Sequence, residues 1–66
     1  MSDSVIVREL VKRLFALYRP SHSDLERMCW MIVHEYHHGF MPTEYDIREV
    51  DENLYLSVLF AARHSL

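Results

Sequence analysis

Apolar residues recur every three or four positions in three stretches of the chain, which is the spacing of α-helices that bury one face. The first stretch, about residues 4–18, has at this spacing Val7, Leu10, Val11, Leu14, Phe15 and Tyr18. The second, about residues 24–38, has Leu25, Met28, Cys29, Ile32, Val33 and Tyr36. The third, about residues 44–64, has Ile47, Val50, Leu54, Val58 and Ala61. The pattern predicts an all-α fold, a compact bundle of three main helices.

Residues that favour helix ends flank the second stretch. Ser23 and Glu26 have the spacing of a capping box, in which each side chain bonds a free backbone amide in the first turn. Gly39 suits the left-handed position that closes a helix, and we expect Phe40 to fold back towards Tyr36. These signals predict that the second helix begins near Asp24 and ends at His38.

The third stretch is apolar on two sides. Opposite its core stripe it carries Tyr45, Leu56, Leu59 and Phe60. A helix that is apolar on two faces is buried on two faces, and two short neighbouring helices cannot easily cover both. Residues 51–53 offer a second helix start, so we expect either one long helix or a helix kinked near that point. Both versions leave surplus apolar surface near Leu56 and Phe60.

Composition narrows the class of protein. The chain has 66 residues, half of them apolar, which predicts one folded domain over residues 1–66 near the lower size limit for a single core. Its net charge of -3 and the lack of a basic run disfavour nucleic-acid binding. A single cysteine favours a reducing cytoplasm. No apolar run approaches the ~20 residues that cross a bilayer, so we expect a soluble protein with no membrane partner.

The segment His34-Glu35-Tyr36-His37-His38 resembles the HExxH motif of zinc metallopeptidases. In that family two histidines one helical turn apart hold zinc, and the glutamate between them acts as general base. The resemblance implies His34 and His38 as zinc ligands and Glu35 as the base. The third ligand would be Glu35, Glu44 or His64, and the sequence does not choose among them.

The helical projection favours a simpler role for the same histidines. It places His34 and His38 opposite the apolar stripe, beside Arg27 and Met31, where they face solvent or a partner. Histidines in the last turn also complement the negative end of the helix dipole. We therefore expect no enzymatic activity and no cofactor, with zinc binding through His34 and His38 as the alternative.

The absence of a convincing catalytic set, together with the surplus apolar surface, predicts a non-enzymatic interaction or regulatory protein that binds another protein and forms a homodimer. The expected partner or dimer surface comprises Trp30, Tyr45, Leu56, Leu59 and Phe60. A narrower hypothesis is an inhibitor, encoded by a virus such as a phage or by a mobile element, that masks a host protein. A DNA-binding helix-turn-helix is a weaker alternative, because residues 43–49 carry three acidic side chains and one arginine and would repel phosphates.

Overall fold

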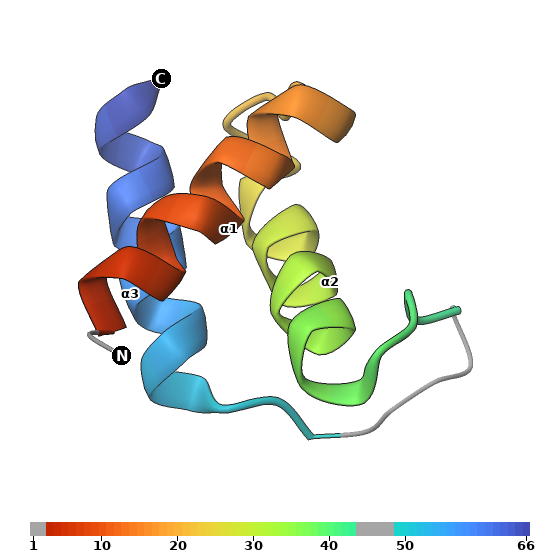
Figure 1. Ribbon diagram of the computed structural model, residues 1–66. Helices are drawn as coiled ribbons and strands as arrows, with labels where there is room; N and C mark the ends of the chain where they lie inside the picture. The colour runs from red at the N-terminus through yellow and green to blue at the C-terminus, as the bar shows by residue number, and fades with distance from the viewer. Residues whose placement is uncertain (1–2, 44–48) are drawn as a thin grey trace.

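The computed structural model describes residues 3–43 and 49–66, which form three helices (Figure 1). These are α1 (Asp3–Leu17), α2 (Leu25–His38) and α3 (Glu52–Ser65). Each helix packs against the other two, and in Figure 1 α1 runs obliquely across α3 towards α2. The predicted all-α fold of three helices is confirmed. No helix within the described ranges is long and apolar enough to cross a membrane.

The core contains side chains from all three helices, and α2 contributes the largest share. The buried apolar residues are Leu10 and Leu14 of α1, Leu25, Cys29, Ile32 and Val33 of α2, and Val58, Leu59 and Ala62 of α3. Tyr36, which was expected in the same stripe, is half exposed. It lies in the last turn of α2 and lines a small cleft with Ile6 and Leu54, so its neighbours cover only one side of the ring.

The predicted capping box at the start of α2 is wrong. Asp24 occupies the cap position and makes no side-chain cap hydrogen bond. The Ser23 hydroxyl forms a hydrogen bond with the Ser21 hydroxyl instead, with 3.0 Å between the two oxygens. Glu26 instead accepts a hydrogen bond from Arg63 Nη2 of α3 at 3.1 Å, so the carboxylate joins two helices rather than closing one.

The end of α2 follows the prediction. Gly39 has φ 82°, and its backbone N–H donates to the Glu35 carbonyl at 2.8 Å. Glycine adopts this left-handed conformation without steric cost, whereas other residues pay about 1 kcal/mol or more. A Cβ atom at this position would meet nothing within 4 Å, so the requirement for glycine comes from the backbone alone.

The third helix is shorter than the predicted span 44–64. Asp51 caps its start, because the Asp51 side chain accepts a hydrogen bond from the Leu54 N–H at 3.1 Å. Glu49 and Val50 are not helical, so a single helix from 44 to 64 is wrong and the alternative start at residues 51–53 is confirmed. An aspartate in this position replaces a missing backbone acceptor and favours a new helix over continuation of an old one. Residues 44–48, which include Tyr45, lie outside the described residues.

Candidate functional site

The HExxH-like segment at the end of α2 contains a buried histidine. His34 has 0% of its surface exposed, so the prediction that it faces solvent is wrong. Its Nδ1 lies 3.0 Å from the carbonyl oxygen of Phe40. Because a carbonyl oxygen only accepts, Nδ1 carries the proton and donates it to this bond. The chain after Gly39 turns back over this side of α2, and the Phe40 ring packs edge-on against the imidazole, with 5.3 Å between the ring centroids.

His38 makes a matching contact one helical turn later. Its Nε2 lies 2.8 Å from the carbonyl oxygen of Glu49, and its ring is 4.5 Å from the His34 ring between centroids. His38 is partly buried rather than fully solvent-facing. The two imidazoles therefore hold Phe40 and Glu49, two described points of the connection between α2 and α3, against the same face of α2.

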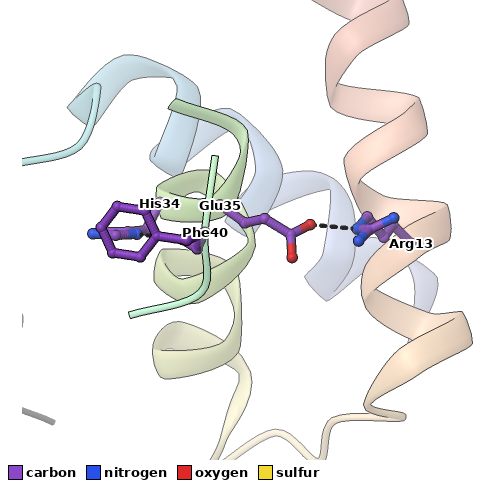
Figure 2. Close-up of polar contacts among 4 residues, drawn as sticks. All are labelled: Arg13, His34, Glu35 and Phe40. Carbon is purple, nitrogen blue, oxygen red and sulfur yellow. Dashed lines mark hydrogen bonds and ion pairs between the residues drawn. The ribbon is translucent and has the colours of Figure 1, made fainter. Parts of the chain in front are cut away.

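Glu35 points away from the His34 imidazole, as Figure 2 shows. Its Oε1 lies 2.6 Å from Nε of Arg13 on α1. The carboxylate that the motif would use as a general base is thus part of the contact between α1 and α2. A base in a zinc peptidase has to reach a water on the metal, which Glu35 does not do from this side of the helix.

Of the other two candidates for a third zinc ligand, only His64 lies within the described residues. His64 lies on α3 with its ring 4.4 Å from the Phe60 ring, and Glu44 is outside the described residues. Within residues 3–43 and 49–66, no group of three or more His, Cys, Asp or Glu side chains is arranged to hold a metal ion. The described geometry does not fit a catalytic zinc site, which needs three protein ligands around one open position.

The lone thiol is also poorly suited to catalysis. Cys29 is fully buried, and burial raises its pKa from 9.0 to about 11, although nearby Arg63 acts in the opposite direction. The thiolate is the reactive form of cysteine, so a raised pKa and an inaccessible sulfur both suppress nucleophilic chemistry. Cys29 serves as a core residue of α2.

An open groove of about 1000 Å³ lies between α1 and α3. On α1 it is lined by the apolar side chains of Val7, Val11 and Phe15, and on α3 by Leu56 and Phe60. Leu56 is 50% exposed and Phe60 67% exposed. These two residues have the exposed positions that a partner surface requires, whereas Leu59 is only 6% exposed and belongs to the core.

Small and basic side chains complete the groove. Ser57 and Ala61 stand one turn apart on α3, and their side chains are small, so α3 fills little space on the side that faces the groove. Arg8 and Lys12 stand one turn apart on α1, and no described residue that lines the groove is acidic. The charged side chains that line the groove in the described part of the chain are therefore both basic, although the chain as a whole carries -3.

Two other residues of the expected partner surface do not line this groove in the described part of the chain. Trp30 is partly buried on α2, with its ring 5.3 Å from the His34 ring. Tyr45 lies outside the described residues. The helix-turn-helix alternative placed its recognition helix at residues 43–49, of which 44–48 lie outside the described residues.

Comparison with known families places the chain in one of them. Residues 5–66 match a family described as Domain of unknown function (DUF8662). The chain belongs to this family. No curated protein and no solved structure matches it.

The half of the groove on α1 was not predicted from the sequence, because Val7, Val11 and Phe15 were placed on one buried stripe with Leu10 and Leu14. Val7, Val11 and Phe15 are only partly buried, while Leu10 and Leu14 are fully covered. The signal was present in the spacing, because Val7, Val11 and Phe15 form one row at four-residue steps and Leu10 and Leu14 form another. Two parallel apolar rows make a stripe wider than one helical neighbour covers.

Proposed function

We propose that the chain is a non-enzymatic module that binds another protein, and that the groove between α1 and α3 is its binding surface. The observation that carries this proposal is the exposure of Leu56 and Phe60 beside the apolar row of α1. Fully burying a leucine or phenylalanine side chain is worth about 1.5–3 kcal/mol. Two such side chains in one groove therefore offer a concentrated source of binding free energy.

The shape of the groove supports a macromolecular ligand. Sites for small molecules enclose most of the ligand surface, whereas this groove is open along two helices. Apolar grooves between helices commonly receive one face of an amphipathic helix. A protein segment is therefore the ligand class that this surface fits best.

The regulatory version of the proposal is an inhibitor, of viral or mobile-element origin, that masks a surface of a host protein. Its support is the small size of the chain together with a large groove relative to that size. The lone buried Cys29 is compatible with a cytoplasmic setting. A second copy of the chain, as in the homodimer expected from the sequence, is the other candidate for the same groove.

Site-specific photo-cross-linking in cells that naturally encode the chain tests this function. A benzoylphenylalanine residue replaces Phe60 in one variant and Leu17 in a matched control. Leu17 is also an exposed apolar residue, 54% exposed, but it does not line the groove. We expect one discrete cross-linked protein from position 60, suppressed by excess unmodified chain, and none from position 17. The same products from both positions, or none from position 60, would contradict the proposal.

A further inference from the structure

We infer that the occupant of the groove is an acidic amphipathic helix of another protein. This inference rests on the proposed function and adds the chemistry of the partner. Three observations carry it: the order of the apolar and basic rows on α1, the small side chains on α3, and the sign of the charge along the groove.

The rows on α1 match the two faces of an amphipathic helix. Val7 and Val11 form an apolar row that lines the groove, and Arg8 and Lys12 form a basic row directly beside it. Both rows repeat every four residues, so both run along the helix at the same pitch. A helix lying in the groove would place its apolar stripe on the first row and acidic residues at four-residue spacing along the second.

The basic row is available to a ligand. Lys12 forms an ion pair with Glu9, in which Nζ and Oε1 are 3.7 Å apart. Both side chains are about two-thirds exposed. An exposed ion pair within one helix contributes little to stability, so exchanging Glu9 for a carboxylate of the partner costs little free energy.

The α3 side of the groove leaves room for a helix backbone. Ser57, Ala61 and Ser65 recur at four-residue steps and line the groove. The Ser65 hydroxyl already donates to the Ala61 carbonyl at 3.1 Å, so it presents little unmet polarity to an apolar ligand. Leu56 and Phe60 stand beside this row and would contact the apolar face of the incoming helix.

The charge of the groove argues against a second copy as the occupant. A two-fold dimer uses the same patch on both subunits. Groove-to-groove packing would bring Arg8 and Lys12 of both copies into one interface, and like charges placed together at an interface cost binding free energy. Arg8 and Lys12 would attract an acidic partner, whereas the same two residues would repel those of a second copy.

Two fluorescein-labelled peptides of about 18 residues test the inference by fluorescence anisotropy. Both carry the same leucine stripe at helical spacing, and the flanking positions are glutamate in one and lysine in the other. We expect the glutamate peptide to bind about tenfold or more tightly than the lysine peptide at low salt, and the difference to shrink at about 0.5 M salt.

Charge variants identify the residues responsible. Arg8→Glu with Lys12→Glu should remove or reverse the preference for the glutamate peptide. The matched control is Arg19→Glu with Arg27→Glu, which changes net charge equally at exposed sites that do not line the groove and should keep the preference. Phe60→Ser should weaken binding of both peptides about tenfold, because the apolar contact is shared.

The outcomes separate this inference from the proposed function. Equal affinity for both peptides, or no binding of either, overturns the acidic-helix inference while specific cross-links from position 60 still support protein binding. Loss of those cross-links overturns both. A dimer in sedimentation velocity that Phe60→Ser dissociates, and the Arg19 and Arg27 control does not, would assign the groove to a second copy and also overturn the inference.

Discussion

Arg13 of α1 and Glu35 of α2 form an inter-helix ion pair in which Nε and Oε1 are 2.6 Å apart (Figure 2). The Glu35 side chain is only 23% exposed, so solvent screens this pair less than a pair on an open helix face. The glutamate of the HExxH-like segment is therefore a structural residue that fixes the first helix against the second.

The first prediction concerns the free energy of this ion pair. A double-mutant cycle of Arg13→Gln and Glu35→Gln should give a coupling of about 1 kcal/mol in urea unfolding followed by circular dichroism. Lys12 and Glu9 provide the control, since their 3.7 Å pair within one helix is largely exposed and should give about 0.3 kcal/mol. Equal coupling free energies in the two cycles would show that the pair between α1 and α2 stabilises the fold no more than an exposed pair within one helix.

The second prediction concerns the buried imidazole. His34→Ala removes a fully buried ring and its hydrogen bond to the Phe40 carbonyl, so it should lower the free energy of unfolding by about 2–4 kcal/mol. His37→Ala changes an exposed residue of the same turn and should cost less than about 0.5 kcal/mol. Chemical denaturation of both variants measures the difference.

Metal removal distinguishes this structural role from zinc binding. The wild-type protein should show the same melting temperature in chelator and in added zinc, because His34 and His38 each bond a backbone carbonyl. A rise of several degrees with zinc that disappears in both His34→Ala and His38→Ala would restore the metal hypothesis.

The third prediction separates folding from binding on α3. Leu59→Ala deletes a core side chain and should destabilise the fold by about 2–4 kcal/mol. Phe60→Ser, at the next position, changes a side chain that is 67% exposed and should alter stability by less than about 0.5 kcal/mol. Thermal unfolding of the two variants measures this contrast. A large loss of stability in Phe60→Ser would place its ring in the core and remove it from the partner surface.

The fourth prediction concerns alkaline pH. The pKa of Cys29 is about 11 in the folded state, against an ordinary value of 9.0 that the unfolded chain retains. Between these values the folded state keeps the thiol proton and the unfolded state loses it. Stability contributed by Cys29 is therefore complete below pH 9 and falls as the pH rises to 11, by about 2–3 kcal/mol in total.

Burial also raises the pKa of Tyr55, which acts in the same direction, so the comparison uses the Tyr55→Phe background. Adding Cys29→Ala to this background should lower stability at neutral pH and flatten its decline above pH 9. Urea midpoints at half-unit pH steps measure the slope. Identical slopes with and without the thiol would contradict the assignment.

The sequence predicted the fold well where one local rule was sufficient. The positions of α1 and α2 in the sequence and the closing role of Gly39 depend on residues within a few positions of each other, and the structure has them close to the expected places. The predictions that were wrong are those in which a contact with a distant part of the chain replaced the expected local contact. Glu26 has the spacing of a capping residue, yet it pairs with Arg63 of α3, a contact that helical spacing within α2 does not encode.

The candidate site was predicted only in part for the same reason. The exposure of Leu56 and Phe60 followed from the surplus of apolar residues on one helix, but their apolar partners on α1 depended on how the helices cross. His34 was expected to face solvent because a helical projection ignores the returning chain, and the Phe40 segment covers that face. Burial of a polar ring by a loop is a tertiary event with no periodic signature.

The groove lies between α1 and α3, which are separated by α2 in the sequence, and this order matters during protein synthesis. A ribosome that has made α1 and α2 holds a chain that still lacks Leu56 and Phe60, so half of the surface does not yet exist. The groove forms only after α3 has been translated and has docked. Capture of a ligand there would therefore report that α3 has docked against α1.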